Sequence, residues 1–347
     1  MPELFLTIFF ISILLFFLGS GVWVAISMIG VSSIGMLIFT SRPVGDAMAT
    51  TIWGTSSSWT LTALPLFVWM GEILFRTKLS KNLFEGLSPW MQKLPGGLIH
   101  VNIVGCALFA AISGSSAATV ATVGKMSIPE LRKRKYPEKI LLGSLAGSGT
   151  LGLLIPPSII LIIYGVTVQE SIAKLFIAGI IPGIMIAIIF MFYVIVWSLI
   201  NKKIMPKSFE NLSFFEKIKR SKKLLPVILL ILAVIGSIYA GIATATEAAS
   251  LGVVGALILS YLQKSLNLET FKRSLLGATK TSCMIAFILA GSSFLSLAMG
   301  FTGLPRNLAI WIQSMDLSPY LLIIVLMIFY IILGMFLDGI SAVVLTM

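Results

Sequence analysis

Long apolar runs without a formal charge recur along this chain and decide its class. Such runs lie at 4–39, 94–124, 140–169 and 175–200. About 20 consecutive apolar residues are enough to cross a bilayer as an α-helix. Hydrophobic residues make up 58% of the 347 residues and charged residues only 11%. The sequence therefore predicts an all-α polytopic membrane protein and excludes a soluble protein.

The basic residues lie in short segments between the apolar runs. Lys and Arg gather around 76–81, 125–139 and 201–223, and the last of these carries eight Lys or Arg against two Glu. Short cytoplasmic loops of membrane proteins are enriched in Lys and Arg. The net charge of +12 thus indicates orientation in the membrane and not a nucleic-acid partner.

The run at 94–124 has a basic cluster at each end and the motif FAAISGSSAATVATVG at 109–124. A single crossing would place one of the two clusters outside the cell. We therefore expect a re-entrant hairpin that turns at SGSS, residues 113–116, inside protein or a water-filled cavity. Ser115 or Ser116 would cap the second arm, whose positive dipole end would point into the cavity. The alternative is one long tilted helix with small residues packed against a neighbour.

The next run contains SGTLGLLIPPS at 148–158, which predicts a broken helix. The two prolines remove two backbone donors, and Gly149 and Gly152 loosen the turn before them. Carbonyl oxygens left free beside hydroxyl groups suit Na⁺, a hard cation that prefers oxygen ligands. A simple proline kink is the alternative.

The remaining segments predict further helices. Thr244 and Glu247 have the spacing of a capping box, although a proton-carrying glutamate is the alternative. Two stretches have the pattern of amphipathic helices at the membrane surface, namely 79–94 and 304–315. Membrane spans are expected at 60–75, 175–200, 224–240, 248–262 and 281–300, the last preceded by a basic amphipathic stretch at 267–280.

The end of the chain repeats the pattern of the SGSS segment. LDGISAVVLTM at 337–347 aligns with ISGSSAATVAT at 112–122, and the charge pattern predicts that the two hairpins enter from opposite faces. Inverted repeats of this kind carry substrate and coupling ions near the membrane midplane. In the alignment Gly339 matches Gly114, Ser341 matches Ser116, Ala342 matches Ala117, and Asp338 lies opposite Ser113.

The spans offer little that would support an enzyme. The one histidine, His100, lies in an apolar stretch and is expected to be a satisfied residue near the membrane surface. No span carries a carboxylate pair or a set of Cys and His ligands for a transition metal. Cys106 and Cys283 are expected to be small buried hydrophobic residues. A channel is disfavoured because nothing resembles a filter ring.

The motifs taken together resemble those of the large membrane subunit of the tripartite ATP-independent periplasmic (TRAP) transporters. The resemblance rests on FAAISGSSAATVATVG, GTLGLLIPPSIILIIYG, LFIAGIIPG, GIATATEAA and GMFLDG, in the family's order. It implies Na⁺-driven import of an organic acid, such as a C4-dicarboxylate or sialic acid, by an elevator mechanism in the bacterial inner membrane. It also implies two partners, a periplasmic binding protein and a small four-helix membrane subunit. A stand-alone Na⁺/di- or tricarboxylate elevator symporter is the alternative.

The resemblance further implies a division into scaffold and transport parts. The scaffold would comprise 1–93 and 170–280, with the basic linker at 201–223 as a boundary between halves. The transport part would comprise 94–169, with the first hairpin and the broken helix, and 281–347, with the start of the second hairpin. The family continues past the position that matches Met347, so part of the second ion site would lie beyond this chain, which alone is not expected to transport.

By position, the resemblance assigns the candidate ligands. One Na⁺ site would be formed by Ser113 and Ser115 with the carbonyl groups around Gly152, Ile155 and Pro157. A second would involve Gly339 beside Asp338, where the carboxylate would help to hold Na⁺ or a water molecule. The substrate would lie between the two hairpin tips, near Ser115, Ser116, Ser158 and Asp338.

Overall fold

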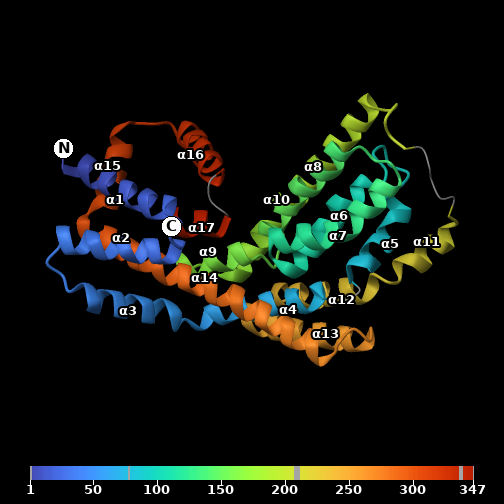
Figure 1. The fold of residues 1–347 in the computed structure, drawn as a ribbon, viewed down its shortest axis with the longest axis horizontal. Helices are drawn as coiled ribbons and strands as arrows, with labels where there is room; N and C mark the ends of the chain where they lie inside the picture. The colour runs from blue at the N-terminus through green and yellow to red at the C-terminus, as the bar shows by residue number, and fades with distance from the viewer. Residues whose placement is uncertain (1, 77–78, 207–211, 336–338, 347) are drawn as a thin grey trace. The chain divides into compact units, whose positions relative to one another are not determined.

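The computed structural model describes residues 2–76, 79–206, 212–335 and 339–346, and this part of the chain is helical without a β-strand (Figure 1). Among these residues three helices are long and apolar enough to cross a membrane: α10 (Ile172–Ile200), α13 (Ala245–Leu262) and α14 (Leu268–Thr302). The number rises to five if two bent helix pairs each count as one span. The predicted all-α class is confirmed, and these helices fit a polytopic membrane protein.

The chain divides into two compact units. The terminal unit comprises Met1–Leu61, Thr167–Gln169 and Cys283–Met347, and the central unit comprises Thr62–Val166 and Glu170–Ser282. The basic linker at 201–223 therefore lies within the central unit. The functional division into scaffold and transport parts stays a prediction.

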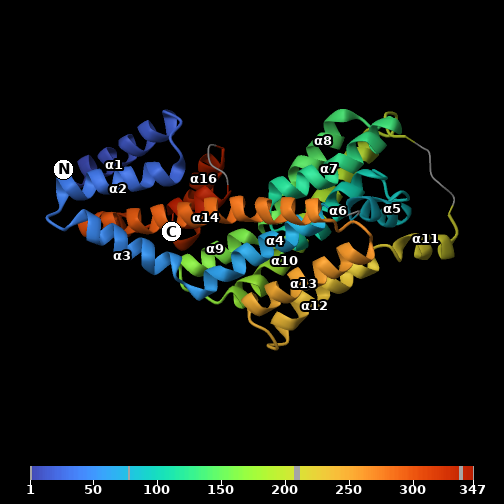
Figure 2. The same ribbon diagram turned by 60° about the horizontal axis from the view of Figure 1, so that its bottom comes forward.

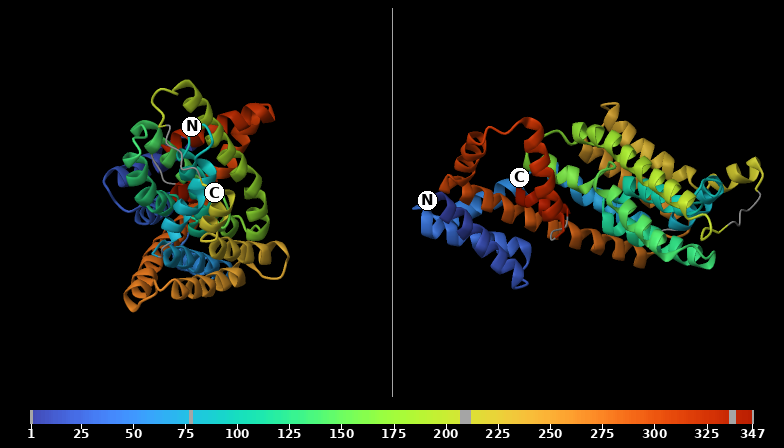
Figure 3. Two further views of the ribbon diagram at one scale, coloured as in Figure 1. Left: turned by 90° about the vertical axis from the view of Figure 1, so that its right-hand side faces the viewer. Right: turned by 90° about the horizontal axis from the view of Figure 1, so that it is seen from above.

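In the terminal unit, α1 (Pro2–Gly19) and α2 (Val24–Phe39) lie side by side (Figures 1 and 3). Their connection lies near Gly19–Gly21, and Gly21 has a φ of 78°, which glycine adopts without strain. The rings of Phe9 and Phe39 pack edge to face at 5.1 Å between centroids. The apolar run at 4–39 therefore folds as two helices and not as one.

The rest of the terminal unit is built from shorter helices. The sequence analysis did not predict α3, which lies between the apolar run at 4–39 and the span expected at 60–75. The amphipathic helix expected at 304–315 is confirmed as α15. The helices are α3 (Val44–Ser56), η1 (Trp59–Thr62), α15 (Leu304–Ser314), α16 (Pro319–Gly334) and α17 (Gly339–Thr346).

Helix α14 corrects a predicted boundary. The sequence separated an amphipathic stretch at 267–280 from a span at 281–300, but the structure has one continuous helix of 35 residues. No proline interrupts this segment, and its glycines each cost only about 1 kcal/mol against alanine, so nothing forces a break. The residues up to Ser282 belong to the central unit and those from Cys283 to the terminal unit.

One layer of the central unit consists of α4 (Ala63–Phe75), α12 (Leu225–Tyr239) and α13. Helix α13 packs against both of the others, and Met70 of α4 fills the space beside Gly252 of α13. The predicted capping box is confirmed: the Thr244 hydroxyl accepts from the Glu247 N–H at 3.3 Å, and the Glu247 carboxylate accepts from the Thr244 N–H at 2.8 Å.

Two amphipathic helices meet at the charged end of the central unit. Helix α5 (Leu79–Met91) confirms the prediction at 79–94, whereas α11 (Phe214–Ser221) was not predicted inside the basic linker. The Trp90 indole N–H donates to Ser221 Oγ at 2.7 Å and joins the two helices. Helix α11 begins with a capping box from Ser213 and Glu216, which is the sequence signal that was overlooked.

Candidate functional site

The candidate site begins at the turn between α6 (Ile99–Ser113) and α7 (Ser116–Lys133), which lie side by side in the central unit (Figure 2). Gly114 ends α6 with a φ of 58°, and the Ser115 hydroxyl caps α7 by accepting from the Ala118 N–H at 3.4 Å. The predicted turn at 113–116 is thus confirmed. Helix α7 continues through Lys125, which the sequence analysis had placed in a basic segment between two apolar runs. The depth of the turn at 113–116 in a membrane stays a prediction.

Three oxygen atoms meet at this turn. The Thr119 hydroxyl donates to the Ser115 carbonyl at 2.7 Å and lies 2.9 Å from the Ser113 hydroxyl. The Ser113 hydroxyl lies 3.3 Å from the same carbonyl oxygen. Ser113 and Thr119 are buried, so these oxygens form a compact polar group inside the fold.

The sequence analysis missed Thr119. Its place four residues after Ser115 is the spacing at which a threonine hydroxyl reaches back to a carbonyl in the preceding helical turn. A hydroxyl group has one proton and two lone pairs, so it can donate to a carbonyl and still offer a lone pair to a cation.

The predicted break in the next helix is also confirmed. Helix α8 (Glu138–Gly149) leads into a 3₁₀ turn, η2 (Thr150–Leu153), and α9 (Ile159–Thr167) starts after the prolines. The Leu151 carbonyl accepts from the Leu154 and Ile155 N–H groups at 3.1 and 2.9 Å. Among the described residues no backbone N–H donates to the carbonyl of Ile155 or Pro157. These are carbonyl oxygens of the kind that the broken helix was expected to expose.

The turn and the break touch through their backbones. A β-carbon on Gly114 would lie 2.9 Å from the Pro157 carbonyl oxygen, and the Ile159 N–H donates to the Gly114 carbonyl at 3.4 Å. A β-carbon on Gly152 would lie 3.0 Å from both the Ser115 carbonyl carbon and the Ser116 nitrogen. The structure therefore brings the predicted residues of the first Na⁺ site together, apart from the side chain of Ile155, which packs against Gly183 of α10.

The residues predicted to bind substrate differ in burial and in their position in the fold. Ser116 is half-buried at the start of α7. The Ser158 side chain is fully buried, and its hydroxyl donates to the Leu153 carbonyl at 2.6 Å. This hydroxyl also accepts from the Leu161 N–H at 3.5 Å, so it already stabilises the start of α9. Gly339 begins α17 in the terminal unit, and Asp338 lies outside the described residues.

Small residues on neighbouring helices allow close approach to the site. A β-carbon on Gly71 of α4 would lie 3.0 Å from the Ser113 Cα, and one on Gly179 of α10 would lie 2.7 Å from the Leu154 carbonyl oxygen. Gly179 and Gly183 have the small-xxx-small spacing that brings helices together in membranes. This spacing was available in the sequence and was not used.

A buried polar cluster also joins α6 to α8. The Asn102 amide donates to Ser144 Oγ at 3.0 Å and to the Leu141 carbonyl at 3.3 Å, while its side-chain oxygen has no hydrogen-bond partner. Asn102 lies eleven residues before Ser113 on the same helix, which corresponds to about 16 Å. The cluster therefore belongs to the base of the hairpin and not to its tip.

The metal-ligand chemistry of an enzyme is not found in the part of the chain that the structure describes, which holds no group of three or more His, Cys, Asp or Glu. His100 is fully buried, and its Nε2 lies 2.8 Å from the Pro95 carbonyl oxygen. Cys106 is buried as predicted, whereas Cys283 is exposed, so that prediction is wrong for Cys283.

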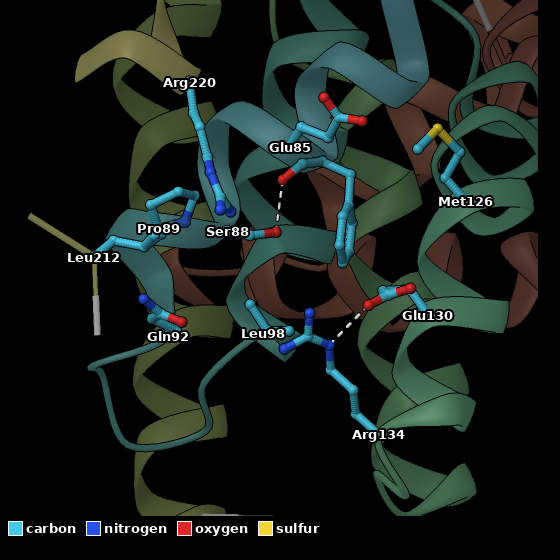
Figure 4. Close-up of a pocket in the computed structure, with 11 residues that line it drawn as sticks. Glu85, Ser88, Pro89, Gln92, Leu98, Met126, Glu130, Arg134, Leu212 and Arg220 are labelled. Atoms are coloured by element: carbon cyan, nitrogen blue, oxygen red, sulfur yellow. Dashed lines mark hydrogen bonds and ion pairs between the residues drawn. The ribbon is translucent and has the colours of Figure 1, made fainter. Parts of the chain in front are cut away.

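A charged cavity of about 270 Å³ lies in the central unit and is drawn in Figure 4. The residues of α7 that line it begin at Met126, ten residues after Ser116 of the SGSS turn. Figure 4 shows Glu85 and Ser88 of α5 above Glu130 and Arg134 of α7, with Arg220 of α11 beside them. Arg134 Nε lies 2.8 Å from Glu130 Oε1. Acidic and basic groups neutralise one another here, which distinguishes the cavity from the uncharged oxygen cluster at the turn.

Comparisons with known proteins point to one family. The family model described as "Tripartite ATP-independent periplasmic transporter, DctM component" matches residues 10–347. The C4-dicarboxylate TRAP transporter large permease protein DctM of Pseudomonas aeruginosa is 32% identical over 311 residues, which cover 89% of this chain and 72% of that protein. The sialic acid TRAP transporter large permease protein SiaM of Vibrio cholerae is 30% identical over 327 residues, 93% of this chain and 75% of that protein.

A further relative joins two components in its name. The isethionate TRAP transporter permease protein DctMQ of Oleidesulfovibrio alaskensis is 29% identical over 330 residues, which cover 94% of this chain and 51% of that protein. This chain thus aligns with about half of the DctMQ protein and with about three quarters of the separate large permeases.

Proposed function

Because this chain belongs to the DctM component family of the tripartite ATP-independent periplasmic transporters, we propose that it forms the large permease of a Na⁺-coupled importer of an organic acid. The names of the relatives specify C4-dicarboxylate, sialic acid and isethionate, all of which are organic anions at neutral pH. The proposed substrate class is therefore inferred from the names of the relatives. The proposed Na⁺ coupling is inferred from the oxygen atoms of the site.

One observation carries the proposal, namely the oxygen cluster at the SGSS turn. Ser113 and Thr119 supply hydroxyl oxygens, and Ser115 supplies a carbonyl oxygen at mutual distances of 2.7 to 3.3 Å. The broken helix touches the turn and adds carbonyl oxygens without backbone partners. A hard monovalent cation would replace the hydrogen bonds inside this cluster, and coordination by these oxygens would offset the cost of burying its charge. Gly152, Ile155 and Pro157 stay in the proposed Na⁺ site on this basis.

The organic anion would be recognised at the same turn. The first N–H groups of α7 carry the positive end of the helix dipole, which favours a carboxylate or sulfonate group. The Ser115 and Ser116 hydroxyls lie at this helix start and would donate to the anion. A bound Na⁺ beside them would add a full positive charge, so ion and substrate would stabilise each other's binding. Roles for Ser158 in substrate binding, and for Asp338 and Gly339 in the second ion site, remain part of the proposal.

The transport step would be an elevator movement of the α6–α7 hairpin together with the broken helix. Helix α6 has 15 residues and is about 22 Å long, which is shorter than the roughly 30 Å hydrocarbon core of a bilayer. This length supports a hairpin that enters the membrane and returns. The backbone contact between turn and break supports their movement as one body.

The proposed partners are a small membrane subunit and a periplasmic substrate-binding protein, with the permease in the bacterial inner membrane. The DctMQ relative supports the first partner, since its name combines two permease components in one polypeptide. The family description, a tripartite periplasmic transporter, supports the second.

Uptake into proteoliposomes tests the proposal. The complete permease would be reconstituted with its small subunit, and uptake of radiolabelled C4-dicarboxylates, sialic acid and isethionate would be measured with and without an inward Na⁺ gradient. We expect uptake of one of these acids only with both Na⁺ and the binding protein. Equal uptake with K⁺ in place of Na⁺ would refute the coupling. Uptake without the binding protein would instead favour the stand-alone symporter.

A further inference from the structure

Two cavities follow one another along α10 on the central unit. The first, of about 330 Å³, lies beside the middle of the helix, and the second, of about 280 Å³, lies at its end. Val194 joins them, because it lines the first cavity and lies against Gly96, which lines the second. Phe190 lines the first cavity and Leu199, near the end of α10, lines the second, and the two are about 14 Å apart at the rise of a helix.

The cavity beside the middle of α10 is an apolar groove between α6, α8 and α10. Six of its eight lining residues have no hydroxyl, amide or charged side chain, and the two exceptions are Ser144 and Tyr193. Gly143 and Gly147 of α8 have no side chains that could fill the groove. A β-carbon on Gly143 would meet no atom within 4 Å. The eight residues are Ile103, Gly143, Ser144, Gly147, Ile189, Phe190, Tyr193 and Val194.

The cavity at the end of α10 has a basic rim. Lys93 and Lys202 line it, and both side chains are exposed. None of its described lining residues is acidic, and within the described part of the chain neither ammonium group lies within ion-pair distance of a carboxylate. Two cations without an acidic counterpart create a positive local potential that attracts an anion.

The Tyr136 hydroxyl group supplies a neutral hydrogen-bond donor to an anion in this cavity. The Leu98 N–H donates to the Tyr136 hydroxyl oxygen at 3.1 Å, and Tyr136 lines the basic cavity with Gly96 and Gly97. Because this bond uses a lone pair of the phenol oxygen, the phenol proton stays available for donation to a ligand. The cavity therefore combines two positive charges with an oriented O–H group, which suits a phosphate.

We propose that these two cavities form a binding site for an anionic phospholipid on the cytoplasmic side of the permease. The phosphate would lie between Lys93 and Lys202 and accept from Tyr136, and one acyl chain would lie in the groove beside Phe190 and Val194. The predicted cytoplasmic location of the basic linker puts the rim at the depth of the headgroups. The groove then supplies the apolar surface that a free phosphate would not use.

Native mass spectrometry of the complete, delipidated permease tests this site. Phosphatidylglycerol and phosphatidylethanolamine with identical acyl chains would be titrated separately. We expect phosphatidylglycerol to bind about ten-fold more tightly, and the double variant Lys93→Gln/Lys202→Gln to lose that preference. The matched control Lys272→Gln/Lys280→Gln, which removes two exposed charges on α14, should keep it.

Two further arms distinguish the alternatives. A β-carbon at Gly143 meets no atom within 4 Å, so Gly143→Phe should fill the groove and weaken binding of both lipids. Thermal unfolding checks that the variant is folded. Equal lipid binding by the wild type and the Lys93→Gln/Lys202→Gln variant would overturn the proposal. So would soluble glycerol phosphate that binds as tightly as the lipid, because a free anion would then be the ligand. A doubled molecular mass that Gly143→Phe abolishes would assign the groove to a second copy of the chain and would overturn it as well.

Discussion

Gly152 lies so close to Ser115 that a β-carbon on the glycine would be 3.0 Å from the serine carbonyl carbon. The contact joins the backbone of the broken helix to the backbone of the hairpin turn, and neither partner is a side chain that can rotate away. The two irregular segments therefore form one packed body in the central unit. This contact makes the geometry of the oxygen cluster sensitive to a single methyl group.

Gly152→Ala should reduce Na⁺-driven uptake about ten-fold. The added methyl group must push the turn away from the break by a few tenths of an ångström. A displacement of about 1 Å in a binding constellation can cost about a hundred-fold in rate, so a smaller shift is expected to cost about ten-fold. The measurement is initial uptake in proteoliposomes at a fixed Na⁺ gradient. Gly236→Ala is the matched control, because a β-carbon there meets nothing within 4 Å. Normal uptake by Gly152→Ala would show that the contact between turn and break is not needed.

Ser113→Ala should raise the Na⁺ concentration for half-maximal uptake by roughly ten-fold, which corresponds to about 1.4 kcal/mol. The variant removes one oxygen from the cluster, and the apolar surroundings of α6 offer no replacement. Ser250→Ala on α13 removes an exposed hydroxyl and should leave the Na⁺ dependence unchanged. Wild-type Na⁺ dependence in Ser113→Ala would move the ion site elsewhere.

Thr119→Val should have a similar effect although the sequence analysis did not select this residue. Valine keeps the shape and removes the hydroxyl that bonds to the Ser115 carbonyl at 2.7 Å. Thr119→Ser keeps the hydroxyl and should retain Na⁺ affinity. The comparison uses the same Na⁺ titration together with the melting temperature of each variant. A loss of melting temperature with unchanged Na⁺ affinity would assign Thr119 to stability alone.

The turn and the break could be predicted because each follows from local chemistry. Ser115 is a strong N-cap residue, and two consecutive prolines remove backbone donors whatever the surroundings. The capping box of Thr244 and Glu247 followed for the same reason. In each case the residues that decide the structure are neighbours in the sequence.

Thr119 and the capping box of α11 had local signals that were overlooked, whereas other missed features depend on partners far away in the sequence. Gly71 matters because α4 approaches the Ser113 backbone, and Gly179 matters because α10 approaches the Leu154 carbonyl. No local pattern states which helix will lie beside the turn. The continuous α14 was missed for a different reason, since a change from charged to apolar residues was taken for the end of a helix.

Glu247→Gln should leave uptake and its pH dependence unchanged, because glutamine at this position keeps the capping box. Thr244→Ala should lower the free energy of unfolding by about 1 kcal/mol, since the hydroxyl that caps α13 is removed. Thr244→Ser is the conservative control and should restore stability. Thermal unfolding and uptake over the physiological range of about pH 6 to pH 8 are the measurements. Loss of uptake in Glu247→Gln with normal unfolding would identify Glu247 as a proton carrier.

The topology of the hairpin gives the last prediction. Helix α6 ends at Ser113 and the chain returns along α7, so the residue before the hairpin and the basic residues on α7 should face the same side of the membrane. Lys93 and Lys125 are both exposed and suit cysteine substitution. The background for labelling needs Cys283→Ser, because that cysteine is exposed, whereas Cys106 is buried and can stay.

Lys93→Cys and Lys125→Cys should therefore react with a membrane-impermeant maleimide only in inside-out vesicles. The reason is energetic: a segment with basic clusters at both ends cannot cross once without placing one cluster against the positive-inside bias. Thr60→Cys is the orientation control, because Thr60 begins the span expected at 60–75 and the basic cluster at 76–81 follows the other end of that span. It should react only in right-side-out vesicles. Labelling of Lys93→Cys and Lys125→Cys from opposite sides would show that the segment crosses the membrane. Transport would then need a site other than the turn at Ser113, because a single crossing leaves no backbone oxygens free there.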